Sequence, residues 1–158
     1  GHGTAFADLD FDGDQDIFCV LGGAFEGDVY QNALYENPYQ GGNNWSVLLV
    51  EGVTANRDAI GAEVCYEVVE NGKKRRIYSI LQSGGSFGCS PLRIQVGLGK
   101  ASAITALHIK WPGTQFTQTI TQVPLNRYLR LQEGRELNTL DIQPIPFKDN
   151  MKGMAIGH

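Results

Sequence analysis

The sequence predicts an all-β fold built around a β-sandwich, and three observations carry this prediction. Short runs of alternating or continuous apolar residues recur roughly every ten positions, a spacing typical of sandwiches and small barrels. Turn-forming residues separate these runs, and the 158 residues include 20 glycines and 6 prolines. No segment holds the i, i+3, i+4, i+7 apolar pattern of an amphipathic helix for long.

The first segment, residues 1–37, differs from the rest of the chain. It contains an aspartate-rich run at 8–16, a strand-like apolar run at 16–21, a glycine-rich loop and a short apolar run at 33–36. Residues 37–44 form turns readily throughout, so we expect the domain boundary there.

Seven strand candidates follow this boundary and make up the expected sandwich. They are residues 45–50, 61–70, 74–82, 92–98, 104–111, 115–123 and 127–132. Asn71 and Gly72 tolerate positive φ and predict a type I′ hairpin turn between the second and third candidates. Periodicity is weak from about Leu137 onward, and we expect residues 135–158 to form an extended tail.

The balance of charged residues argues against several classes of partner. The chain has 13 Lys and Arg against 17 Asp and Glu, a net charge of −4, and so lacks the basic surplus of a general nucleic-acid binder. No apolar run approaches the ~20 residues that cross a bilayer as a helix. We therefore expect no nucleic-acid partner and no membrane span.

The most specific signal is the aspartate loop, residues 8–16, which places an aspartate at every second position: Asp8, Asp10, Asp12, Asp14 and Asp16. Four of these carboxylates can converge on one cation, with the carbonyl oxygen of Asp14 as a further ligand and Gly13 permitting the sharp turn. Such hard oxygen ligands suit Ca²⁺, and no His or Cys lies within the run to favour Zn²⁺ or Cu²⁺. We predict a calcium site; the alternative is a solvated acidic turn, in which five carboxylates would repel one another.

Two parts of the chain resemble known families. Residues 5–18 resemble the FG-GAP/VCBS repeat of calcium-loaded β-propellers. Downstream, the sequence resembles the ASPIC/UnbV domain, known from cartilage acidic protein and many bacterial secreted proteins. The strings that carry this second resemblance, in the family's order, are residues 42–45, 50–62, 83–87, 96–99 and 110–113.

The resemblance implies three units: a propeller-repeat fragment with a calcium loop at 1–37, an ASPIC/UnbV-like β-sandwich at 42–134, and the tail at 135–158. It also implies that the rest of the protein's own propeller is a partner. An extracellular or periplasmic location is implied as well. It does not imply a specific activity.

One string has the form of a catalytic motif. Residues 84–88 fit the G-x-S-x-G pattern of a nucleophile elbow around Ser86, but such an elbow needs a helix after the serine. Pro91 instead leads into a strand-like run, and His108 alternates onto the outward face of its strand. We expect a glycine-rich β-turn and no enzymatic activity.

Two polar stretches leave alternatives open. Asn56, Arg57 and Asp58 suit a structural loop with Asx turns and an ion pair from the arginine, or a second ion or ligand site. The basic cluster at 73–76 suits a solvated hairpin tip, or a contact with a polyanion.

The leading hypothesis is a non-enzymatic, calcium-stabilised extracellular module for adhesion, scaffolding or ligand binding, with an unknown protein or glycan as its ligand. Two alternatives remain open. One is an accessory domain of a secreted carbohydrate-active or hydrolytic enzyme, and the other is a purely structural cap of the propeller.

Overall fold

The computed structural model describes residues 3–23, 25–27, 29–38, 41–85, 89–145 and 147, and these form eleven strands and no helix. The all-β prediction is therefore confirmed. The strands are β1 (Gly3–Ala7), β2 (Asp16–Val20), β3 (Ala33–Tyr35), β4 (Asn44–Glu51), β5 (Glu63–Glu70), β6 (Lys73–Ile80), β7 (Ile94–Gly99), β8 (Ala103–Lys110), β9 (Thr117–Ile120), β10 (Tyr128–Gln132) and β11 (Leu137–Leu140). Within these ranges the chain offers no helix that could cross a bilayer.

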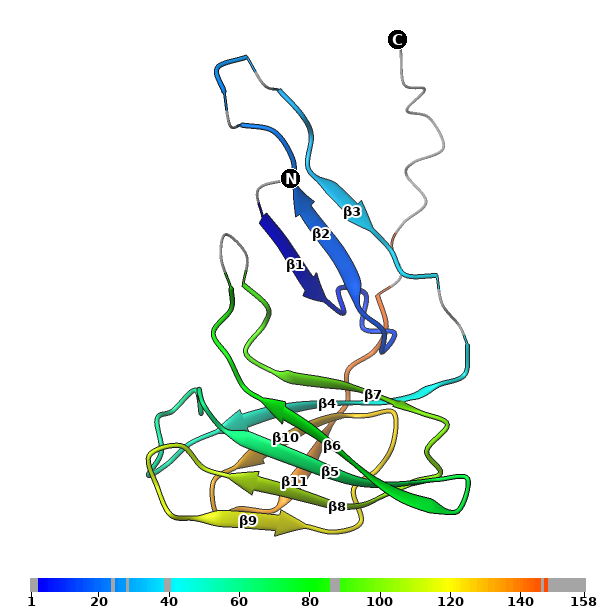
Figure 1. Cartoon of the computed structure of the whole chain (residues 1–158), viewed down its shortest axis with the longest axis vertical. Helices are drawn as coiled ribbons and strands as arrows, with labels where there is room; N and C mark the ends of the chain where they lie inside the picture. The colour runs from blue at the N-terminus through cyan, green and yellow to red at the C-terminus, as the bar shows by residue number, and fades with distance from the viewer. Residues whose placement is uncertain are drawn as a thin grey trace.

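The strands make three sheets, and none of them closes into a barrel. Two have four strands each, in the orders β11-β10-β4-β7 and β6-β5-β8-β9, and all their pairs are antiparallel except β10 with β4. They share one apolar core, an arrangement consistent with the predicted β-sandwich (Figure 1). The third sheet, β1-β2-β3, stands beside this pair.

The core forms where alternate residues of each strand face the opposite sheet. On β5 these are Val64, Tyr66 and Val68, all fully or almost fully buried. Leu48 of β4 and Leu129 of β10 meet them from the other sheet in the same cluster. Burying one such aliphatic side chain contributes about 1.5–3 kcal/mol, so this alternation fixes which face of each strand turns inward.

One polar pair crosses the core. Ser46 Oγ lies 3.4 Å from the Tyr66 hydroxyl, and both side chains are buried. Burial raises the pKa of Tyr66 to about 12, so the phenol stays neutral and its hydroxyl group is satisfied inside the sandwich.

The predicted hairpin turn between β5 and β6 is present. Asn71 and Gly72 have φ of 52° and 73°, as a type I′ turn requires, and the two strands pair in unbroken register. In the basic cluster, Arg75 pairs with Glu70 at 2.8 Å and Arg76 with Glu67 at 2.6 Å.

The β1-β2-β3 sheet exposes apolar side chains on both of its faces. Register places Phe18 beside Leu34 on one face and Ile17 beside Tyr35 on the other. Phe18, Leu34 and Tyr35 are 39%, 40% and 56% exposed. The turn between β1 and β2 points toward the outer face of the β11-β10-β4-β7 sheet (Figure 1).

The predicted tail differs from the structure at its start. Residues 137–140 form β11, which pairs with β10 from Leu131↔Leu137 to Tyr128↔Leu140. The strand is short and lies at the edge of its sheet, and its two middle residues, Asn138 and Thr139, are exposed. It therefore lacks the apolar alternation by which the other strands were predicted. Residues 146 and 148–158 of the predicted tail lie outside the described residues.

Candidate metal centre and adjoining cleft

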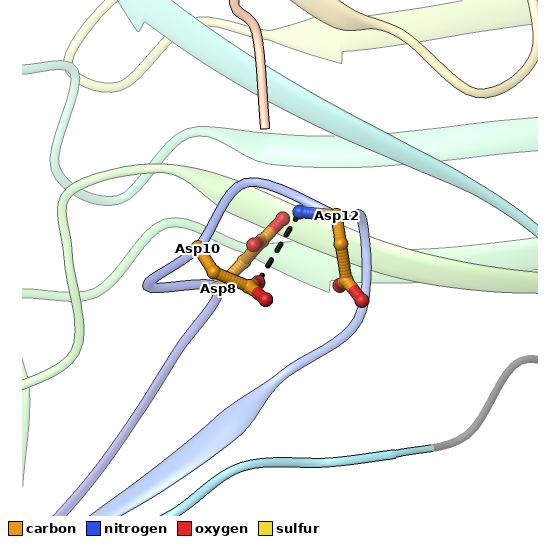
Figure 2. A group of neighbouring side chains, drawn as sticks. All are labelled: Asp8, Asp10 and Asp12. Carbon is orange, nitrogen blue, oxygen red and sulfur yellow. Dashed lines mark hydrogen bonds between the residues drawn. The ribbon is translucent and has the colours of Figure 1, made fainter. Parts of the chain in front are cut away.

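The aspartate loop folds through hydrogen bonds between its own carboxylates and backbone. The amides of Gly13 and Asp14 donate to Asp8 Oδ2 and Asp12 Oδ1, each at 3.0 Å. The Asp12 amide donates to Asp10 Oδ1 at 3.3 Å (Figure 2). Gly13 has φ of 104°, which a residue with a side chain adopts only at a cost. Asx turns of this kind bend the chain tightly, so the carboxylates are brought together.

Three of the predicted ligands meet in one group. One oxygen each from Asp8, Asp10 and Asp12 lie within 4.8 Å of one another. Asp8 is only 1% exposed, and its Oδ1 is buried without a hydrogen-bond partner. A buried anionic oxygen left unpartnered is costly, and a cation between the three carboxylates would compensate it.

The electrostatics of the loop favour the same occupant. Burial raises the pKa of Asp8 and of Asp10, and the neighbouring charge of Asp12 raises both further. Burial, followed by the charges of Asp12 and the other loop aspartates, raises the pKa of Asp14 to about 6. Without a cation these groups therefore resist ionisation, and a bound divalent cation reverses that tendency.

The other two predicted ligands stand apart from this group. Asp16 is buried, and its two oxygens accept hydrogen bonds from the amides of Leu9 and Asn37, each at 3.0 Å. It thus ties the loop to the segment that follows β3. Both carboxylate oxygens of Asp14 are buried without a hydrogen-bond partner, and its carbonyl oxygen accepts a bond from Gln95 Nε2 at 3.2 Å.

The loop is docked on the sandwich by residues from distant strands. The hydroxyl group of Tyr128 donates to Asp8 Oδ2, and Arg93 Nη2 donates to the Asp8 carbonyl oxygen at 2.9 Å. The Tyr128 ring meets Phe11 and Trp45 edge to face, with centroids 5.8 and 5.4 Å away. Burial and the Asp8 carboxylate raise the pKa of Tyr128, so its hydroxyl remains a donor.

Gly13 meets the sandwich directly. A Cβ atom at this position would lie 2.1 Å from Cε2 and Nε1 of Trp45. Glycine is therefore required here both by the positive φ and by the indole ring. The amide of Ile145 donates to the Asp10 carbonyl oxygen at 2.7 Å, so the segment after β11 also contacts the loop.

Sequence reasoning missed Arg93, Gln95 and Tyr128, which lie 81 to 120 positions from their partners in the loop. The sequence shows that Tyr128 is an aromatic residue at the start of a predicted strand, but this position does not reveal that its hydroxyl group contacts Asp8. Val47, beside Tyr128 in the sheet, is fully buried although it lies outside the core cluster. The outer face of this sheet is thus covered where the loop sits.

Two clefts flank Trp45 and Asp12. The larger, of about 560 Å³, is lined by residues of the loop and by β4 and β7, including Asp14, Gln95 and Gly97. The second, of about 430 Å³, lies beside Tyr128 and the segment that follows β11. Pro144 borders both clefts.

The loop at Asn56, Arg57 and Asp58 is held together by its own backbone contacts. The Asn56 side chain accepts from the Ile60 amide and donates to the Ile60 carbonyl oxygen, both at 3.0 Å. Among the described residues, Arg57 has no ion-pair partner within 4.0 Å, and the Asp58 carboxylate accepts no hydrogen bond. The Asx contact expected of a structural loop is present at Asn56, and the described part of the chain offers Arg57 no ion-pair partner within 4.0 Å.

Glu133, which sequence reasoning did not single out, supports the preceding turn. Its Oε2 accepts hydrogen bonds from the amides of Val53, Thr54 and Ala55 at 2.7, 2.7 and 2.9 Å. These bonds hold the pKa of Glu133 below its usual value, chiefly through Ala55. The carboxylate therefore acts as a structural anchor for the turn.

The residues of the catalytic-looking string are only partly described. Ser86, Phe87 and Gly88 lie outside the described residues. His108 lies on the outer sheet face as predicted, with Nδ1 2.9 Å from Thr119 Oγ1 and Nε2 3.7 Å from Glu67 Oε1.

A family model described as ASPIC and UnbV matches residues 52–138. The match spans β5 to β10 and leaves the aspartate loop and β4 outside it. No curated protein matches the chain.

Proposed function

The chain belongs to the ASPIC and UnbV family, and on that premise we propose that it is a non-enzymatic, calcium-stabilised extracellular module for binding and scaffolding. A bound Ca²⁺ would neutralise the aspartate loop and hold it in place on the sandwich. We also propose an extracellular or periplasmic location, which the resemblance to secreted proteins of the family supports.

One observation carries the calcium assignment: Asp8 belongs both to the carboxylate group and to the contact with the sandwich. Its Oδ2 accepts from Tyr128, and its Oδ1 is buried without a hydrogen-bond partner. One of its oxygens lies within 4.8 Å of oxygens of Asp10 and Asp12. The donor set is all oxygen, which suits Ca²⁺. Asp8, Asp10 and Asp12 would hold the ion, and the carbonyl oxygen of Asp14 is a candidate for a fourth ligand.

The β1-β2-β3 sheet supports the second part of the proposal, that this segment is an FG-GAP/VCBS-type propeller repeat. Phe18 and Leu34 on one face and Tyr35 on the other remain more than a third exposed. A single propeller blade cannot bury both faces by itself and needs neighbouring blades. The rest of the protein's own propeller is therefore the proposed partner of this sheet. A purely structural cap of that propeller is the second candidate function, favoured by the same exposed faces.

Thermal unfolding of the full chain in millimolar calcium and in excess chelator tests the proposal. Free calcium at 100 times its dissociation constant should stabilise the fold by ~2.7 kcal/mol if it binds only the folded state. Asp12→Asn should abolish most of this gain. Asp58→Asn, at an exposed aspartate of the sandwich, is the matched control and should keep it. Identical melting curves with and without calcium would contradict the assignment.

A further inference from the structure

We propose that the larger cleft, between the aspartate loop and β7, binds a neutral saccharide, with one sugar ring lying over Gly97 beside the indole of Trp45. This inference names a ligand class for the proposed binding function. It rests on that proposal because the aspartate loop forms one wall of the cleft. No bond is made or broken; the site is a binding site.

The cleft has the size and the composition of a small-molecule site. Its volume of about 560 Å³ falls within the usual range for such sites. One wall is the tip of the loop with Gly13 and Asp14, and the other consists of Trp45 from β4 with Gln95 and Gly97 from β7. An aromatic ring beside a few polar groups is what a ligand with apolar and polar faces requires.

Gly97 has no side chain and therefore leaves space on the sheet surface next to the indole ring of Trp45. It lies directly across from Trp45 in the antiparallel β4–β7 pair, on the outer face of the sheet. A Cβ atom built on Gly97 would have no other atom within 4 Å, and its φ is not positive. The backbone here therefore does not require glycine. A glycine inside a strand weakens the strand, and one recurrent reason for it is close approach of a ligand.

Two residues that line the cleft, Asp14 and Gln95, hold three acceptors without hydrogen-bond partners. Both carboxylate oxygens of Asp14 and Oε1 of Gln95 are buried without hydrogen-bond partners. The Gln95 side chain lies against the backbone of Asp14, since its Nε2 donates to the Asp14 carbonyl oxygen at 3.2 Å. An acceptor buried without a donor is costly, and neighbouring hydroxyl groups of a sugar would supply several donors at once.

The charge of the cleft selects against anionic ligands. Among the described residues that line it, Asp12 and Asp14 are acidic and none is a lysine or an arginine. The proposed Ca²⁺ would neutralise Asp12, and the Asp14 carboxylate would still repel phosphates, sulfates and uronic acids. A sugar ring has an apolar C–H face for the indole and hydroxyl groups for the acceptors, so the neutral saccharide fits both features.

The test uses the full calcium-loaded chain and three probes: methyl β-glucoside, methyl β-galactoside and N-acetylglucosamine. Binding is followed by saturation-transfer NMR and by tryptophan fluorescence, which reports on Trp45 because Trp111 is fully buried. At least one probe should bind saturably. Gly97→Phe should fill the cleft and weaken this binding at least tenfold, which corresponds to about 1.4 kcal/mol. Gly97→Ala should change the binding by about twofold or less, because the added methyl group meets no protein atom.

Both variants should keep the calcium-dependent melting shift of the unmodified chain. Failure of all three probes while calcium still stabilises would overturn the saccharide inference and leave the calcium proposal standing. If a sugar binds and Gly97→Phe weakens that binding, but calcium does not change the melting curve, the calcium proposal is overturned and the saccharide inference stands. Binding unaffected by Gly97→Phe would overturn the saccharide inference as well.

Discussion

The hydroxyl group of Tyr128 donates a hydrogen bond to Asp8, although the two residues are 120 positions apart. This contact joins the aspartate loop to the sandwich through Oδ2 of Asp8, while Oδ1 is buried without a hydrogen-bond partner. One oxygen of the same carboxylate belongs to the group formed with Asp10 and Asp12. The same carboxylate therefore links the candidate metal centre to the core domain, so events at the loop should be measurable as changes in the stability of the whole chain.

Tyr128→Phe should lower the free energy of unfolding by about 2 kcal/mol, the usual worth of a hydrogen bond to a charged group. The ring would keep its edge-to-face contacts with Phe11 and Trp45, so the loss isolates the hydroxyl group. Urea denaturation measures the change. Tyr30→Phe, at a 70% exposed tyrosine, is the control and should be neutral. Equal stability of both variants would show that the Tyr128 contact contributes nothing.

Gly13→Ala should destabilise the fold by about 3 kcal/mol, of which about 1 comes from the positive φ and about 2 from overpacking. The added methyl group would lie 2.1 Å from the Trp45 ring. Gly27→Ala separates the two causes, because Gly27 also has positive φ, 84°, but no atom within 4 Å of its would-be Cβ. It should cost only about 1 kcal/mol. Chemical denaturation of both variants gives the comparison.

Calcium-stripped protein should become more stable as the pH falls from about 7 to about 5. Burial and neighbouring carboxylates raise the pKa of Asp14 from 3.8 to about 6, so the folded chain binds this proton more tightly than the unfolded chain. The free energy of unfolding therefore rises as the pH drops through 6 toward 3.8. Urea midpoints across this range measure it, and Asp14→Asn should weaken the dependence. A midpoint that falls steadily with acidification would contradict the raised pKa.

Local patterns in the sequence predicted much of the sandwich. Val64, Tyr66 and Val68 alternate inward as their spacing implies, and Asn71–Gly72 forms the turn that its positive φ values permit. The strand at 137–140 was missed because an edge strand buries too little of itself to need alternation. Such a strand is fixed by its partner β10 and not by its own composition.

The candidate site was predictable only as far as its ligands are neighbours in sequence. The spacing of Asp8, Asp10 and Asp12 was enough to predict that they meet, because each carboxylate accepts a hydrogen bond from a nearby amide and so bends the chain locally. The role of Asp16 in tying Leu9 to Asn37 depends on the path of β3. Contacts from distant strands depend on how the loop docks, which no local pattern encodes.

Calorimetric titration of the full chain with calcium at neutral pH is the decisive experiment for the calcium site. We expect one ion bound per chain, binding lost in Asp8→Asn, and binding kept in Asp58→Asn, whose exposed side chain lies outside the carboxylate group. Absence of saturable calcium binding by the folded, unmodified chain, or full binding by Asp8→Asn, would contradict it.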